Sequence, residues 1–145
     1  MKALTALMLI LALALLGCGS SEDGDGAATI AYETGGGMTG QGYRIEIEPG
    51  GAATLQTYEG TEERLVEFEV PGEELADLNA QLQEADVAAL GEELSGDCFD
   101  CFSYSLEYGG ESAAADSATM DDEFLAATEP LRKLADDNLP PGFGP

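Results

Sequence analysis

The chain has 145 residues, a net charge of −24 at neutral pH, and neither histidine nor tryptophan. An acidic surface of this size repels phosphates, so we expect no nucleic-acid partner and no attraction to anionic lipid headgroups. Without histidine, the usual Ser-His and Cys-His catalytic pairs and the histidine-rich metal sites cannot be assembled. The composition predicts a protein that is not an enzyme and holds no metal or diffusible cofactor. Its charge serves either solubility or the attraction of a basic partner.

The first 17 residues have the pattern of a bacterial export signal. Lys2 precedes an apolar run from Ala3 to Leu16, which is too short to span a membrane. The run ends in Leu15-Leu16-Gly17-Cys18, which resembles a lipobox, so we expect cleavage before Cys18 and lipid on its thiol. The alternative is an ordinary signal peptide with a cysteine near the cut. A two-chain lipid would anchor the protein stably on the extracytoplasmic side of a bacterial membrane.

Three segments follow the signal. Residues 18–28 comprise the lipidated cysteine and a small, acidic stretch that is typical of a flexible tether, with a reach of at most about 35 Å. Residues 29–139 are long enough to form one domain around a single core. Residues 140–145, rich in Pro and Gly, are expected to be a loose tail.

The first half of this domain alternates between apolar and polar residues, as half-buried antiparallel strands do. Tyr43, Ile45 and Ile47, for example, alternate with charged residues, and Pro49 with Gly50 then turns the chain. Short connections of this kind predict an antiparallel meander. Its four strands are expected at Thr29–Thr34, Tyr43–Glu48, Ala52–Tyr58 and Arg64–Val70.

Helical spacing begins after Pro71. Leu75, Leu78 and Leu82 predict a helix over Glu73–Gln83. Two further strands are expected at 102–108 and 111–118, because Phe102, Tyr104, Leu106 and Tyr108 alternate with polar residues and Gly109-Gly110 suits a two-residue hairpin.

A final helix is expected from Thr119 onward. Thr119 with Asp122 resembles a capping box, and Pro130 inside the helix is expected to kink or restart it. The resulting order is β-β-β-β-α-β-β-α. It predicts an α+β fold, an antiparallel sheet with helices packed on one face.

The segment Gly35-Gly36-Gly37-Met38-Thr39-Gly40 matches the GxGxxG pattern of dinucleotide-binding loops. Such a loop must open a helix, whereas a strand is expected directly after it, and the acidic charge opposes any phosphate. We interpret the segment as a connection between strands in which glycines adopt positive φ. The candidate contact residues for a protein partner are Gly36, Gly37, Met38, Thr39 and Gly40.

Cys98-Phe99-Asp100-Cys101 has the spacing of a redox motif. In thioredoxin-like proteins the motif opens a helix, whereas here a strand is expected to follow and acids flank both thiols. In an oxidising compartment we expect a local structural disulfide between Cys98 and Cys101. A thiol oxidoreductase that uses the same pair is the alternative.

Two stretches of sequence together indicate a known family. The first is Thr29-Ile-Ala-Tyr-Glu-Thr-Gly-Gly-Gly-Met-Thr-Gly40, and the second is Cys101-Phe-Ser-Tyr-Ser-Leu-Glu-Tyr-Gly-Gly110, with the Leu-spaced helix between them and a closing helix after them. This pattern resembles the emfourin-like domain, known from protein inhibitors of thermolysin-type metalloproteases. Met38 stands where the family pattern has an aromatic residue. The resemblance implies occlusion of a protease by direct contact.

The sequence thus leads to one main hypothesis, a lipid-anchored, non-catalytic protein-binding domain of the cell envelope, most specifically a metalloprotease-inhibitor-like module. It would touch the membrane only through the lipid on Cys18, with a protein such as a protease as its partner. One alternative is a structural envelope lipoprotein without an enzyme partner, whose function does not depend on Met38 and Thr39. The other is the thiol–disulfide protein that uses Cys98 and Cys101.

Overall fold

The structure, a computed structural model, describes residues 28–143. The predicted signal peptide (1–17), the lipidation site Cys18 and nearly all of the predicted tether lie outside the described residues and stay predictions. The described elements follow in the order β-β-β-β-α-α-β-β-β-α, so the α+β class is confirmed.

The first half of the domain forms the antiparallel meander that its alternation predicts. The pairing of the first two strands runs from Ile30↔Ile47 to Gly36↔Gln41, which leaves residues 37–40 as the hairpin turn. The four strands are β1 (Ile30–Gly36), β2 (Gln41–Ile47), β3 (Ala52–Glu59) and β4 (Glu62–Glu69).

The second half of the sheet differs from the prediction. The strand β6 (Phe102–Tyr108) pairs antiparallel with β1 and with β7 (Glu111–Asp116). A short further strand, β5 (Glu92–Glu93), pairs with β7 in parallel. The sheet therefore has seven strands in the order β4-β3-β2-β1-β6-β7-β5 and is mixed, not antiparallel throughout. Two glutamates carry no hydrophobic alternation, so the sequence pattern contains no signal for β5.

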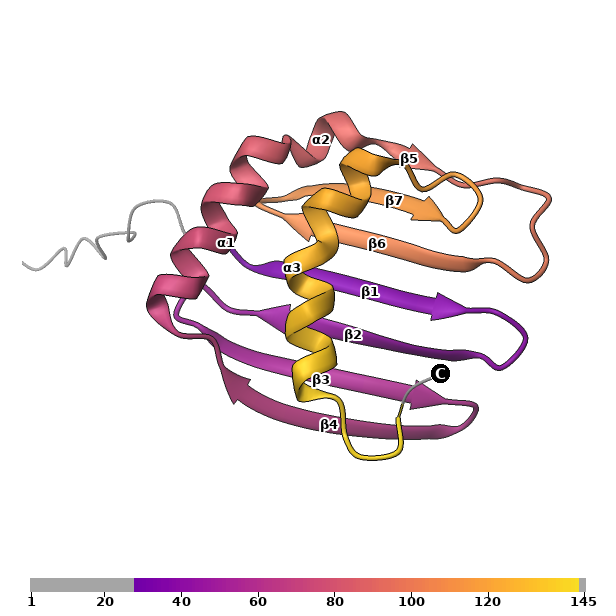
Figure 1. Ribbon diagram of the computed structural model, residues 1–145, viewed down its shortest axis with the longest axis horizontal. Coiled ribbons are helices and arrows are strands. Elements are labelled where there is room, and N and C mark those ends of the chain that lie inside the picture. The colour runs from indigo at the N-terminus through magenta and orange to yellow at the C-terminus, as the bar shows by residue number, and fades with distance from the viewer. Residues whose placement is uncertain (1–27, 144–145) are drawn as a thin grey trace, which may run out of the picture.

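The helices lie on one face of the sheet (Figure 1). α1 (Gly72–Ala85) is followed by the single turn α2 (Val87–Leu90), and α3 (Asp122–Asn138) crosses the strands. The core lies between these two layers because the inward positions of the strands and the leucines of the helices are apolar. Its fully buried side chains include Ile30, Tyr32, Ile45, Ile47, Leu55, Leu82, Leu106 and Leu131.

Pro130 does not restart the last helix, because α3 is continuous from Asp122 to Asn138. A proline in a helix has no N–H for the carbonyl four residues before it, which here is the carbonyl of Ala126. The side chain of Gln81 on α1 supplies the missing donor, with 2.9 Å between Gln81 Nε2 and the Ala126 oxygen. A tertiary hydrogen bond thus satisfies the carbonyl that the proline leaves unpaired.

The N-terminus of α3 also differs from the prediction. Asp121 is the N-cap residue, and its Oδ1 accepts a hydrogen bond of 2.8 Å from the N–H of Phe124. Thr119 lies before the helix, where its hydroxyl donates to the carbonyl of Glu93. The capping box of Thr119 and Asp122 is therefore wrong, because a better-placed carboxylate caps the helix.

Candidate functional site

Two loops come together at one end of the sheet (Figure 1). One is the β1–β2 turn at residues 37–40, and the other is the segment that leads from β5 through both cysteines to the start of β6, residues 94–102. Gly36 pairs with Phe102 across the strands, and the N–H of Gly37 donates to the carbonyl of Cys101 at 3.3 Å. We call these two segments the hairpin–disulfide end.

Exposed hydrophobic side chains are concentrated at the hairpin–disulfide end. Phe99 is 100% exposed and Met38 is 88% exposed, while Leu94 and Phe102 are exposed to 59% and 39%. Among the described residues, these are four of the five large hydrophobic side chains that remain exposed, and the fifth is Leu65 on β4. Single exposed hydrophobics are ordinary, but a group of them at one end of a domain is typical of an interaction surface.

The glycines of the predicted contact loop have different structural roles. A Cβ on Gly36 would lie 2.7 Å from the Cys101 carbonyl, and one on Gly37 would lie 3.1 Å from the Phe102 ring. A Cβ on Gly40 would meet nothing within 4 Å. Gly36 and Gly37 thus allow the hairpin to pack against the disulfide loop, while Met38, Thr39 and Gly40 stay exposed to solvent.

Cys98 and Cys101 form the expected disulfide, with 5.5 Å between their Cα atoms. The strand β6 follows Cys101 directly, so the pair does not open a helix as a thioredoxin-like motif does. The bond closes the loop that presents Phe99 to solvent. In this position the disulfide constrains the conformation of an exposed aromatic residue.

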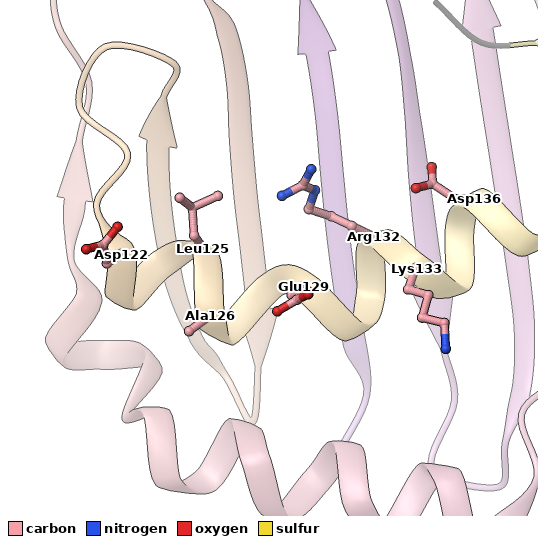
Figure 2. Close-up of a pocket in the computed structure, with 7 residues that line it drawn as sticks. All are labelled: Asp122, Leu125, Ala126, Glu129, Arg132, Lys133 and Asp136. Carbon is pink, nitrogen blue, oxygen red and sulfur yellow. The ribbon is translucent and has the colours of Figure 1, made fainter.

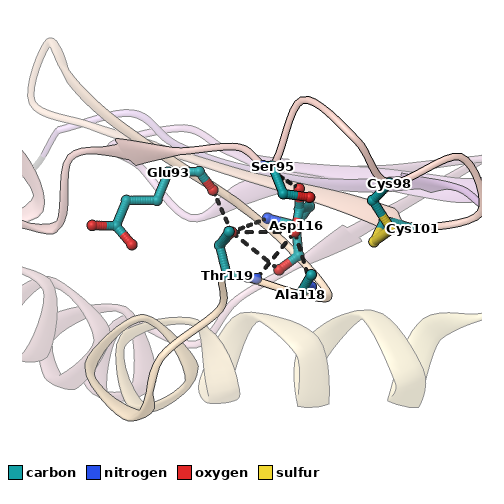
Figure 3. The surroundings of a disulfide bond; sticks show 7 residues. All are labelled: Glu93, Ser95, Cys98, Cys101, Asp116, Ala118 and Thr119. Atoms are coloured by element: carbon teal, nitrogen blue, oxygen red, sulfur yellow. Dashed lines mark hydrogen bonds between the residues drawn. A yellow bond between two sulfur atoms is a disulfide. The ribbon is translucent and has the colours of Figure 1, made fainter.

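Asp116, which has no predicted role, anchors the same loop from below (Figure 3). Its carboxylate is buried and accepts hydrogen bonds from the N–H groups of Ser95 (2.6 Å), Ala118 (2.9 Å) and Thr119 (3.0 Å). Burial by itself would raise the pKa of Asp116, but these hydrogen bonds outweigh burial and lower the pKa. The last residue of β7 therefore holds the start of the disulfide loop in place.

On the sheet face opposite the helices, the ring of Tyr58 covers two glycines. Gly35 and Gly42 are cross-strand partners, and a Cβ on Gly42 would overlap the Tyr58 ring and the Thr34 carbonyl. The Tyr58 hydroxyl lies 3.0 Å from Glu33 Oε1. These glycines provide space for a tyrosine of the same chain, a packing role that the sequence pattern alone does not indicate.

A surface hollow with a volume of about 550 Å³ follows α3 (Figure 2). All of its lining residues belong to this one helix, so the hollow is the outer surface of a helix and not a cleft between elements. Within residues 28–143, no group of three or more acidic or cysteine side chains is placed to hold a metal ion. No helix in this part of the chain has the length and apolar character needed to cross a membrane.

The sequence analysis did not single out Leu94 and Phe99, and it treated Phe102 only as part of a strand, whereas all three are exposed in the structure. Leu94 and Phe99 are single apolar residues within an acidic, glycine-containing segment, and neither the strand pattern nor the helix pattern includes them. Neither a protein-family model nor a curated protein matches the chain. The resemblance to the emfourin-like domain stays a prediction.

Proposed function

We propose that the chain is a lipid-anchored, non-catalytic domain that binds another protein through its hairpin–disulfide end. The observation that carries this proposal is the exposure of Met38, Leu94, Phe99 and Phe102 on two neighbouring segments at one end of the sheet. The hydrogen bond from Gly37 to Cys101 joins the two segments, and the disulfide and Asp116 hold the second one in place. Apolar side chains that are held in place but exposed to water do not stabilise the domain itself. They do lower the entropic cost of binding a partner, because the surface is already ordered.

The direction of β1 supports the same proposal. The strand begins at Ile30, next to the predicted tether, and ends at Gly36, beside the hairpin turn. Seven residues of strand span about 20 Å. With a lipid on Cys18, the tether would join the domain at the end opposite the exposed side chains. They would then face away from the membrane and toward a partner.

The charge favours a basic partner. Asp97 and Asp100 flank the exposed Phe99, and the whole chain carries −24. An apolar centre with a charged rim is the usual composition of a protein interface. The negative potential would speed the approach of a basic surface and keep acidic proteins away.

In its more specific form, we propose that the partner is a thermolysin-type metalloprotease. The support is the sequence resemblance to the emfourin-like domain, together with the exposure of Met38 and Thr39 on the loop that the resemblance points to. Inhibition would result from insertion of this loop into the protease cleft.

Substitution of the exposed side chains tests the proposal. The double variant Met38→Ser/Phe99→Ser removes apolar contact area without touching the core, and Leu65→Ser is the matched control because Leu65 is 62% exposed on β4. Titrated against several thermolysin-type proteases, the unmodified chain and L65S should inhibit and the double variant should not. Absence of inhibition at micromolar concentration for all of them would remove the inhibitor form of the proposal.

Photo-crosslinking tests the broader form. A photoreactive amino acid at position 38 or 99 should yield a crosslinked protein partner in the envelope of the producing cells, and one at position 65 should not. Equal results at the three positions would refute binding through the hairpin–disulfide end and favour a structural envelope lipoprotein. Fractionation of Cys18→Ser tests the anchor, because this variant should move from the membrane fraction to the soluble fraction.

A further inference from the structure

A cavity of about 270 Å³ lies next to the hairpin–disulfide end, between α3 and the neighbouring parts of β1, β2 and β6. Four strand residues and one residue of the C-terminal tail contribute aromatic rings to it. Aromatic walls with a few polar groups are typical of sites for small organic ligands, and this volume is just below the usual range for such sites. The aromatic lining residues are Tyr32, Tyr43, Phe102, Tyr104 and Phe143.

Two opposite charges lie on the helix side of the cavity. Arg132 and Asp136 both line it and are both exposed. They are one turn of α3 apart and extend to the same side of the helix, whereas Lys133 extends to the other side (Figure 2). Neither forms an ion pair within the described part of the chain, in contrast to Arg44, which contacts three carboxylates on the sheet.

Tyr32 and Tyr43 of the cavity are neutral at physiological pH. Burial is the main cause that raises the pKa of Tyr43 to about 12, and the charge of Asp136 adds to it. Burial raises the pKa of Tyr32 as well. The cavity therefore presents aromatic rings, one cation and one anion.

We propose that this cavity binds a small zwitterion, namely a free α-amino acid with an aromatic or large apolar side chain. The carboxylate of the ligand would pair with Arg132, its ammonium group would pair with Asp136, and its side chain would lie among the rings. The ligand is neutral overall, so the charge of −24 does not oppose it. The net negative charge of the chain would repel a simple anion, and Arg132 would repel a simple cation.

Three probes separate the contributions of the two charges. L-phenylalanine carries both charged groups, its amide lacks the carboxylate, and 3-phenylpropionate lacks the ammonium group. Each would be titrated into the ¹⁵N-labelled full chain while following the amide of Gly42, which lines the cavity. The amide of Gly110, in the turn at the far end of β6, should not respond. A ligand of this size should bind with a Kd of about 1 mM, and loss of either charged contact should weaken binding about tenfold.

Isosteric substitutions then assign each contact. With Arg132→Gln, phenylalanine should bind about as weakly as its amide binds to the unmodified chain. With Asp136→Asn, phenylalanine should bind about as weakly as 3-phenylpropionate does. Lys133→Gln and Asp137→Asn are the matched controls, because they change the net charge by the same amounts at exposed positions that do not line the cavity. Both controls should bind phenylalanine as the unmodified chain does.

Several outcomes would overturn the proposal. The first is that phenylalanine causes no saturable shift of the Gly42 amide resonance. The second is that the three probes bind with equal affinity. The third is that the control variants lose as much affinity for phenylalanine as Arg132→Gln and Asp136→Asn do. Thermal unfolding of each variant shows whether it is folded. The proposal does not rest on protein binding by Met38 and Phe99, so M38S/F99S should keep the phenylalanine response.

Discussion

The hydrogen bond between Gln81 and the Ala126 carbonyl explains how α3 accommodates Pro130. Gln81→Ala removes the side-chain donor that contacts this carbonyl. Both residues are exposed, so water would take over part of the hydrogen bonding. We therefore expect a loss at the low end of the range for one hydrogen bond, about 0.5–1 kcal/mol in the free energy of unfolding.

A double-mutant cycle isolates this contribution. Pro130→Ala restores an N–H at position 130 and should stabilise the protein by about 1–3 kcal/mol. In that background the Ala126 carbonyl has an intrahelical donor, so Gln81→Ala should cost little. The coupling between the two substitutions should be about 0.5–1 kcal/mol. Gln83→Ala, an exposed glutamine two positions along α1, is the matched control for the change in helix propensity.

Urea unfolding followed by far-ultraviolet circular dichroism measures all of these variants on one scale. Two results would refute the reasoning. One is a loss for Gln81→Ala no larger than that for Gln83→Ala, and the other is an equal loss with and without Pro130. Either would mean that solvent already satisfies the Ala126 carbonyl and that the contact from α1 adds nothing.

Three further predictions concern Gly42, Asp116 and Tyr43. Gly42→Ala should destabilise the protein by about 1–3 kcal/mol in urea unfolding, because the added methyl group overlaps the Tyr58 ring, whereas Gly50→Ala, which meets nothing within 4 Å, should be near neutral. The pKa of Asp116 is lowered, so its contribution to stability is present above the ordinary aspartate pKa of about 4 and is lost as the pH falls. Asp116→Asn should therefore lower the urea midpoint of unfolding at neutral pH and make this midpoint less dependent on acid pH. The pKa of Tyr43 is raised to about 12, so its contribution to stability is present below the unfolded-state pKa of about 10 and is lost as the pH rises toward 12. Tyr43→Phe should therefore reduce the loss of stability at alkaline pH, as measured by thermal unfolding.

Local patterns in the sequence were sufficient for most elements of the fold. The alternation of Tyr43, Ile45 and Ile47 predicted β2, and the leucine spacing predicted α1, because side-chain periodicity reports directly on which face of an element is buried. The spacing of Cys98 and Cys101, in an expected oxidising compartment, was enough to predict their disulfide. Each of these inferences depends on residues close together in the chain.

Other features depend on contacts between distant segments. Pairing of β1 with β6 and the parallel strand β5 result from long-range contacts that leave no local pattern. The hydrogen bond from Gln81 to Ala126 joins residues 45 positions apart, and it allows α3 to continue through Pro130, where the local pattern predicted a kink or a restart.

The candidate sites divide in the same way. The sequence by itself determined that Met38 and Thr39 lie on a turn and that two cysteines close a loop, because glycine content and cysteine spacing are local properties. Only the tertiary structure placed that turn beside the disulfide loop and left Phe99 exposed on this loop. It also brought Arg132 and Asp136 to a cavity whose tyrosines come from three different strands. A surface or cavity built from separate segments is determined by packing, and packing is a property of the whole fold.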